Sequence, residues 1–199
     1  GATSPGSRGS ECGSRAEALD PADVTELDFR LVWEQAFQWS AFFTPGIRNY
    51  PLWEAVYRHA KVAPEAVALA AASPLRNILV ISEDWCGDAV NIVPVLVRLV
   101  EALPGVELRH LPRDQHPEVM NRYLTNGTRS IPIVIGLDAD FRELGHWGPR
   151  PSELQAWVVF NKDKMPKEQR YAEVRRWYAR DKGATSVREF LAAIGAKEA

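Results

Sequence analysis

The sequence predicts an α/β fold in which a mixed sheet is flanked by helices, and two observations carry this prediction. Apolar runs typical of strands alternate with helical patterns after residue 75, in the order β-α-β-α-β-β. The apolar run 77–82 also turns directly into a long helical segment. Strands separated by helices favour a parallel core, and the last two strands are close enough for an antiparallel hairpin.

The core is expected to span residues 75–160, and its elements follow from the pattern. The expected strands are 77–82, 106–111, 131–136 and 141–145. The expected helices are 86–103, 117–124 and 151–160. Pro104-Gly105 stops the first helix, and Asn126-Gly127 closes the second because Asn and Gly accept the left-handed conformation.

Residues 21–74 predict an N-terminal helical extension that packs on this core. Apolar residues recur at intervals of three and four from Phe29 to Ser40, which indicates one amphipathic helix. A second helix begins near Pro51, where the missing N–H of proline is harmless, and a third covers 64–72. Residues 1–20 are rich in Gly and Ser, and we expect a disordered arm or an expression tag there.

Residues 161–199 predict a C-terminal tail of two helices. Tyr171, Val174 and Tyr178 mark one face of the first helix. The second carries a capping-box pattern, Ser-Val-Arg-Glu at 186–189, in which the Ser caps the helix and the Glu binds back to it.

Composition excludes several classes of function. The chain has 199 residues, of which 24 are basic and 26 acidic, and a formal charge of -2, so no basic surface for nucleic acid or an anionic membrane is indicated. No apolar run is long enough for a membrane span. Two cysteines make no disulfide framework, and with no secretory signal they favour the cytoplasm. The histidines lack the partners of a zinc site, so we expect no metal.

The turn at 82–89, Ser-Glu-Asp-Trp-Cys-Gly-Asp-Ala, places Cys86 beside the N-terminus of the following helix. Unpaired backbone N–H groups at such a terminus favour a negative charge and can lower the pKa of a thiol. Thiolate is the nucleophilic form of cysteine. The turn therefore predicts thiol chemistry with Cys86 as the nucleophile.

With this turn and this order of elements, the chain resembles the thioredoxin-like superfamily. Residues 85–89, Trp-Cys-Gly-Asp-Ala, are similar to the family's Trp-Cys-Gly-X-Cys loop, and Pro94 falls where the family has a helix-kinking proline. Residues 130–132, Ser-Ile-Pro, are similar to the cis-proline loop that lies against the family's active-site cysteine. The resemblance spans residues 77–160 and is greatest to a bacterial group with Glu-Asp-Trp-Cys-Gly-Asp-Cys and Arg-Ser-Ile-Pro motifs and extra helices before the core. It implies a thioredoxin-like fold and thiol–disulfide oxidoreductase activity.

The resemblance also implies which residues meet a substrate. Cys86 would attack a disulfide, and Ile131 with cis-Pro132 would offer backbone to an extended substrate strand. The full set of expected substrate-binding residues is Trp85, Gly87, Asp88, Arg129, Ile131 and Pro132. The expected partners are protein or small-thiol disulfides, with no nucleic acid and no membrane.

Departures from the family pattern bear on turnover. Ala89 replaces the second loop cysteine, so no disulfide can form between positions 86 and 89, and a mixed disulfide has no local resolving thiol. Val80 stands where thioredoxins have a buried acid that assists proton transfer. The acids at 83, 84 and 88 surround the thiol with negative charge, which Arg129 offsets in part.

Four explanations of Ala89 stay open at this point. The protein is a monothiol enzyme that uses an outside thiol such as glutathione, or a binding protein that kept the groove and lost turnover. Alternatively, Cys12 in the N-terminal arm resolves the mixed disulfide, or Ala89 is an engineered change that traps a substrate. We favour a monothiol oxidoreductase that acts on protein or low-molecular-weight disulfides without a cofactor, because Trp85, Gly87 and Pro132 all serve access to a thiol. The alternative is a non-catalytic thioredoxin-fold interaction module.

Overall fold

A five-stranded sheet with strand order β1-β3-β2-β4-β5 forms the centre of the molecule. The computed structural model describes residues 26–197. The strands are β1 (Phe37–Gln38), β2 (Asn77–Ser82), β3 (Glu107–Pro112), β4 (Ile133–Leu137) and β5 (Glu143–Trp147). The helices are α1 (Phe29–Gln35), α2 (Trp39–Phe42), α3 (Tyr50–His59), α4 (Pro64–Ala72), α5 (Gly87–Glu101), α6 (Pro117–Met120), α7 (Ser152–Asn161), α8 (Lys167–Asp181) and α9 (Ala184–Ala193), with a 3₁₀ turn at Arg113–Gln115. This arrangement is the predicted α/β fold with a central mixed sheet.

The pairing of the third predicted strand differs from the parallel core that the sequence favoured. β2 runs parallel to β3 but antiparallel to β4, and β4 runs antiparallel to β5. Helix α6, between β3 and β4, does not return the chain along the sheet, because it has four residues and advances by only about 6 Å at 1.5 Å per residue. A six-residue strand such as β3 is about 20 Å long. Ser82 pairs with Pro112 at the end of β3, and the adjacent Ile81 pairs with Ile133 at the start of β4. β4 thus starts at the end of the sheet where β3 stops and runs back.

The predicted helix from Phe29 to Ser40 is wrong, because an edge strand interrupts it. Ala36 has extended backbone (φ -82°, ψ 144°) and ends α1. The next two residues form β1, in which Phe37 pairs with His110 at the open edge of β3. The pairing satisfies backbone groups that a bare sheet edge would leave unpaired. The helices at 50–59 and 64–72 lie where they were predicted.

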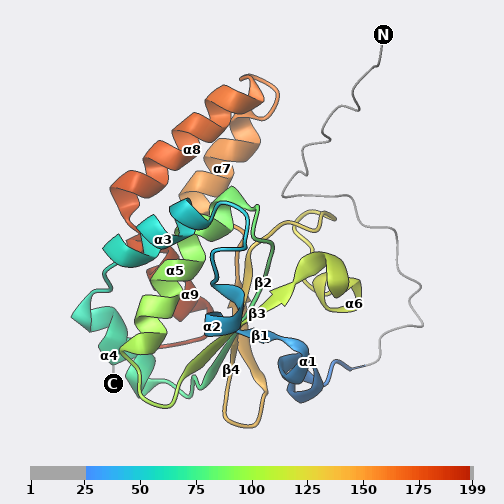
Figure 1. Ribbon diagram of the computed structural model, residues 1–199, viewed down its shortest axis with the longest axis vertical. Helices are drawn as coiled ribbons and strands as arrows, with labels where there is room; N and C mark the ends of the chain where they lie inside the picture. The colour runs from blue at the N-terminus through green and yellow to red at the C-terminus, as the bar shows by residue number, and fades with distance from the viewer. Residues whose placement is uncertain (1–25, 198–199) are drawn as a thin grey trace.

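The helices divide between the two faces of the sheet. Figure 1 shows α3, α4, α5 and α9 on one side and α1 and α6 on the other. Helix α5 is buried along most of its length, from Asp88 near its start to Leu99 near its end. The predicted helix-kinking residue, Pro94, lies within it. β2 and β4 are buried along almost their whole length because they are the inner strands of the covered sheet. Helices α7 and α8 extend together beyond one end of the sheet (Figure 1).

The C-terminal tail contains the two predicted helices, but the capping box predicted in the second does not form. α9 begins at Ala184, after Gly183 at φ 82°, so Ser186 is a buried residue within the helix. Glu189 instead accepts hydrogen bonds from Ser152 at the start of α7 and from the indole N–H of Trp147. The acid that was expected to cap its own helix thus supports the start of another one.

The Asn126-Gly127 pair also has a different role from the one predicted. α6 ends at Met120, before the pair is reached. Asn126 and Gly127 take φ values of 50° and 75° and form a tight turn, across which Thr125 and Thr128 exchange both backbone hydrogen bonds. Asn-Gly is the preferred sequence for such a two-residue turn. The predicted β4–β5 hairpin is present, with both strands shifted toward the C-terminus.

Candidate functional site

The predicted nucleophile lies where the sequence placed it, between β2 and α5. Cys86 is the N-terminal capping residue of α5 (φ -76°, ψ 115°), and its carbonyl oxygen accepts the N–H of Val90. Its own N–H donates to the carbonyl oxygen of Glu83, which closes the turn after β2. The side chain of Cys86 accepts no capping hydrogen bond from the first N–H groups of this helix. The positive end of a 15-residue helix therefore faces the thiol.

The thiol is enclosed. Cys86 has a relative exposure of 0%, and its Sγ donates to the carbonyl oxygen of Ile131 at 3.5 Å. The peptide bond from Ile131 to Pro132 is cis, and both of these residues are buried. Trp85 is half-buried and Gly87 is exposed, so these neighbours form the accessible rim. The structure thus brings together four of the predicted site residues around the thiol.

Each of the three acids around the thiol is held by another part of the chain. Glu83 accepts the N–H of Asp114 at 2.9 Å, and Asp84 accepts the N–H of Arg48 at 2.8 Å. Burial raises the pKa of Glu83, although the hydrogen bond from Asp114 opposes this effect. These contacts tie the turn to segments on both sides, so its carboxylates serve to fix its shape.

Asp88 was predicted to bind substrate, and the structure gives its carboxylate a different role. Its side chain is almost fully buried and forms a bidentate ion pair with Arg150, with Nε–Oδ1 at 2.9 Å and Nη2–Oδ2 at 2.8 Å. The hydroxyl of Tyr178 donates to Oδ1 at 2.8 Å. Burial raises the pKa of Tyr178 well above its usual value, and the charge of Asp88 raises it further. The carboxylate is therefore occupied by its own chain, and we assign it a structural role.

The arginines near the thiol also differ from expectation. Arg129 donates from Nε to Asn121, while its carbonyl oxygen accepts from Arg113 at 3.1 Å. Arg113 is buried, pairs with Asp114 and lies over the ring of Trp85 at 5.1 Å. Arg113 thus contacts the rim as a cation, and the sequence did not single it out. Its only local signal is its place at the end of β3, the strand that runs parallel to β2.

The residues that depart from the family pattern are both in the core. Ala89 lies fully buried in the first turn of α5, and Val80 lies fully buried in β2 opposite His110 of β3. Cys12, the candidate resolving thiol, lies outside the described residues. Within residues 26–197, no group of three His, Cys, Asp or Glu side chains is arranged to hold a metal ion.

A sequence model of the family described as Thioredoxin matches residues 38–180, from the edge strand β1 almost to the end of α8. This match covers more than half of the chain. The protein belongs to the thioredoxin family.

Solved structures agree with this thioredoxin-family fold. A protein of unknown function from Pseudomonas aeruginosa is 17% identical, with a TM-score of 0.68 over 85% of this chain and 98% of that one. An HIV epitope scaffold is 16% identical, with a TM-score of 0.65 over 86% of this chain and 100% of that one. No curated protein matches the sequence. At these identities the likeness concerns the fold alone.

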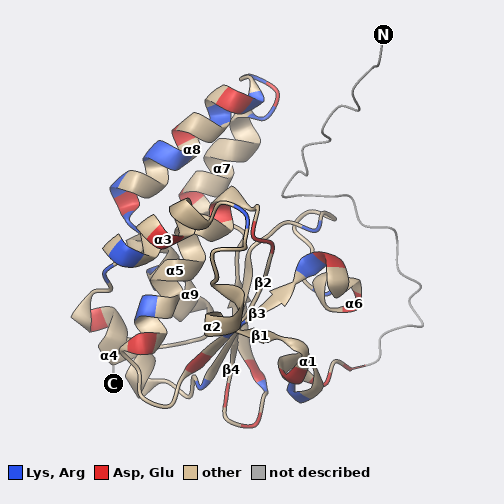
Figure 2. Ribbon diagram, in the orientation of Figure 1, with Lys and Arg blue, Asp and Glu red and all other residues tan. Residues whose placement is uncertain are grey.

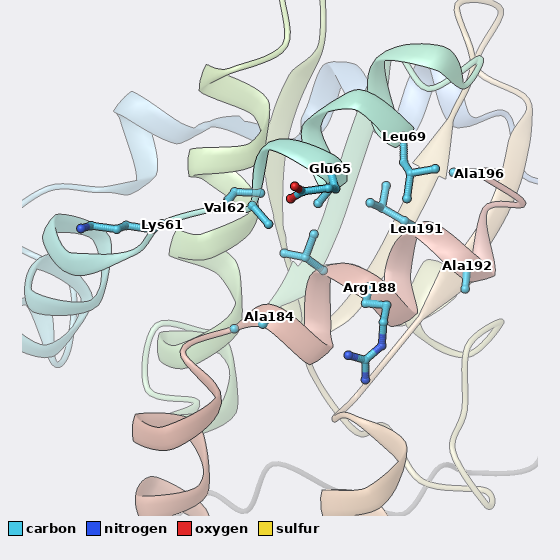
Figure 3. Close-up of a pocket in the computed structure, with 13 residues that line it drawn as sticks. Lys61, Val62, Glu65, Leu69, Ala184, Arg188, Leu191, Ala192 and Ala196 are labelled. Carbon is cyan, nitrogen blue, oxygen red and sulfur yellow. The ribbon is translucent and has the colours of Figure 1, made fainter. Parts of the chain in front are cut away.

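Two further findings describe the surface of this thioredoxin-family chain. None of its described helices has the length and apolar character needed to cross a membrane. A groove of about 440 Å³ lies between α4 and α9. Figure 3 shows Val62, Leu69 and Leu191 in this groove, with Lys61 and Arg188 pointing away from it. The groove is largely apolar and contains no residue of the thiol turn.

Proposed function

We propose that the protein is a monothiol thiol–disulfide oxidoreductase in which Cys86 is the nucleophile. One observation carries the proposal: the Cys86 sulfur lies at the N-terminus of α5 and 3.5 Å from the carbonyl oxygen of Ile131. The helix terminus favours the thiolate over the thiol, and the thiolate attacks disulfides. Membership of the thioredoxin family supports the same chemistry.

The reaction has two exchange steps. The Cys86 thiolate, having lost its proton to solvent, attacks one sulfur of a disulfide and forms a mixed disulfide, while the other sulfur leaves as a thiolate and takes up a proton. Since Ala89 provides no second thiol, an external low-molecular-weight thiol such as glutathione attacks the mixed disulfide. That step restores the Cys86 thiolate and releases the substrate sulfur in a disulfide with the external thiol. The protein carries no cofactor in this scheme.

The remaining site residues act by shape. Trp85 and Gly87 form the rim through which a disulfide approaches, and the backbone beside Ile131 and Pro132 aligns an extended substrate strand. Arg129 positions the loop before Pro132 through its bond to Asn121. The substrates are protein or low-molecular-weight disulfides in a bacterial cytoplasm.

A second candidate function, a non-catalytic interaction module with the same fold, has its own support. Cys86 is fully buried, and an enclosed thiol reacts only when the chain around it opens. Ala89 and Val80 lack the groups that complete and assist a dithiol cycle. On this reading Cys86 is a small apolar core residue.

Formation of a mixed disulfide separates the two functions. A Cys12→Ser variant leaves Cys86 as the sole cysteine. Incubation of this variant with oxidised glutathione, followed by intact mass spectrometry, should show one glutathione adduct, which added dithiothreitol removes. The Cys12→Ser/Cys86→Ser double variant is the control and should show none. If the folded Cys12→Ser variant gains no adduct while the same variant unfolded in urea gains one, the interaction module is the correct function.

A further inference from the structure

A cleft of about 490 Å³ opens directly beside the thiol turn. It lies between α3, the first turns of α5, and α8, and it is lined by Trp85, which precedes the nucleophile, and by Gly87 and Asp88, which follow it. Its volume falls in the range of about 300–1,000 Å³ that is usual for small-ligand sites, which is enough for a few peptide residues. A chain segment bound in this cleft would therefore lie next to Cys86.

One wall of the cleft is apolar. Leu52 and Val56 of α3 face it, together with Val90 of α5 and Val174 of α8. Leu52 is 56% exposed, although it is a large aliphatic side chain. When a partner covers exposed aliphatic groups at the edge of a cavity, apolar surface is removed from water and the complex is stabilised. This wall suits an aliphatic side chain of a ligand.

The part of the cleft formed by α8 also carries cationic side chains. Lys167 and Arg175 of α8 line the cleft, and Figure 2 shows Lys and Arg interspersed with Asp and Glu along this helix. Asp88 is the one acid among the described lining residues, and Arg150 neutralises it in the ion pair described above. Asn49 and Asn91 add polar side chains to the lining. The net charge of the lining therefore complements an anionic group.

We propose that this cleft binds a peptide segment with alternating aliphatic and acidic side chains, adjacent to the reactive cysteine of a disulfide-bonded protein substrate. The aliphatic side chain covers Leu52 and Val56, and the carboxylate faces Lys167 and Arg175. The inference rests on the proposed function, because the segment owes its place to the disulfide that Cys86 attacks. It extends that function by naming what the protein selects in its substrates.

Binding is tested without thiol chemistry, so that it stands apart from the redox proposal. The full chain with Cys86→Ser is labelled with ¹⁵N and titrated with the probe acetyl-Leu-Glu-Leu-Glu-amide. Amide signals of residues lining the cleft, such as Gly87 and Asn91, should shift and saturate. The neutral peptide acetyl-Leu-Gln-Leu-Gln-amide should bind at least about five-fold more weakly, since two exposed charge pairs are lost. Affinity for the acidic peptide should also fall as salt is added.

Matched variants locate the contacts. Arg175→Glu should weaken binding of the acidic peptide about ten-fold, because attraction becomes repulsion, while Arg180→Glu changes net charge equally on the same helix but outside the cleft and should have little effect. Leu52→Ser should weaken binding several-fold, whereas Leu31→Ser, at the same 56% exposure on α1, should not.

Three results would overturn the inference. They are equal binding of the acidic and neutral peptides, equal effects of Arg175→Glu and Arg180→Glu, and tighter binding of S-methylglutathione than of the acidic peptide at the same signals. The last result would assign the cleft to a small thiol. Adduct formation on Cys86 with oxidised glutathione is measured independently, so a failure of the redox proposal leaves the binding result readable.

Discussion

The hydroxyl of Tyr178 donates a 2.8 Å hydrogen bond to Oδ1 of Asp88 and thereby joins α8 to the first turn of α5 across 90 positions of sequence. Arg150 binds the same carboxylate from the segment between β5 and α7. Three segments of the chain therefore meet at one buried anion beside Cys86. Cys86 is the N-terminal capping residue of α5 and Asp88 lies in the first turn of the same helix, so the thiol adjoins this cluster. The stability of this cluster and access to the thiol should be linked.

The Asp88–Arg150 pair should be strongly coupled. Arg150→Gln leaves a buried carboxylate without its cation and should cost about 3–5 kcal/mol of unfolding free energy. Asp88→Asn should also destabilise the protein. The double variant should lose less unfolding free energy than the sum of the two single losses, by more than about 1 kcal/mol. Urea unfolding of the four proteins measures this. The exposed pair Arg142–Asp140 is the control cycle and should couple by less than about 1 kcal/mol. Additive effects at Asp88 and Arg150 would show that their ion pair contributes nothing.

Tyr178→Phe should expose the thiol more often. The variant removes a hydrogen bond to a buried carboxylate, worth about 1.5–3 kcal/mol, from the contact that holds α8 at the first turn of α5. If that loss favours local opening, alkylation of Cys86 by iodoacetamide in a Cys12→Ser background should accelerate about ten-fold or more. Tyr57→Phe removes a hydroxyl that binds the exposed Glu101 and should leave the rate nearly unchanged. Equal rates for both variants would mean that α8 does not control access.

The sequence was enough to predict the elements that surround Cys86, because each has a local signal. An apolar run, a turn rich in polar residues and a helical period identify β2 and α5, and their junction places the thiol. The contacts of Asp88 have no such signal. Arg150 and Tyr178 lie 62 and 90 positions away, and nothing in the local pattern pairs either of them with an acid. For this reason the sequence predicted a substrate-binding role for Asp88 and not its buried ion pair.

Two errors in the fold have a similar origin. Apolar spacing from Phe29 to Ser40 fits a helix, but pairing of Phe37 with β3 is a tertiary contact that overrides the period. Likewise, Ser186 and Glu189 satisfy a local capping rule, yet Glu189 finds stronger partners in Ser152 and Trp147. Burial of Cys86 also depends on packing between distant segments. Local patterns therefore predicted where elements lie better than which side chains meet.

His110 should make stability fall in mild acid. Burial lowers the pKa of His110 to about 3, partly opposed by the backbone of Ser82, so the folded protein keeps the ring neutral and stacked on Phe42. The unfolded chain binds a proton near pH 6.5, so stability is complete above that pH and is lost as pH falls toward about 3, by up to about 1.4 kcal/mol per unit. His110→Leu should reduce the change of unfolding free energy with pH between about pH 6.5 and 5, as measured by urea unfolding. The exposed His59→Gln should keep the wild-type slope, and an unchanged slope in His110→Leu would contradict the argument.

Gly148→Ala should disturb the loop over Pro132. Gly148 has φ 133°, and a Cβ there would lie 2.2 Å from the carbonyl oxygen of Pro132, so the backbone must move. The variant should lose about 2 kcal/mol or more of unfolding free energy and, because Arg150 follows two residues later, should also speed alkylation of Cys86. Gly46→Ala is the control, since its added Cβ meets only a side-chain oxygen at 3.8 Å. Normal stability of Gly148→Ala would show that this loop yields easily.

Ala89→Cys tests whether only the resolving thiol is missing. Position 89 lies one turn after Cys86 in α5, so the variant has the two-cysteine spacing of a dithiol site. Because Ala89 is fully buried, the added sulfur should cost about 1–3 kcal/mol of stability. If the thiol environment is otherwise competent, the variant should catalyse insulin reduction by dithiothreitol well above wild type, because a disulfide between 86 and 89 now releases the substrate.

Two controls make this result decisive. Ala89→Ser has nearly the same volume without a thiol and should stay at the wild-type rate, as should Ala89→Cys combined with Cys86→Ser. A folded Ala89→Cys protein that forms the 86–89 disulfide yet reduces no insulin would show that Val80 and the closure around the thiol prevent turnover. Together with a failure of the native protein to form a glutathione adduct, that outcome would favour the interaction module, because a binding groove does not depend on a resolving thiol.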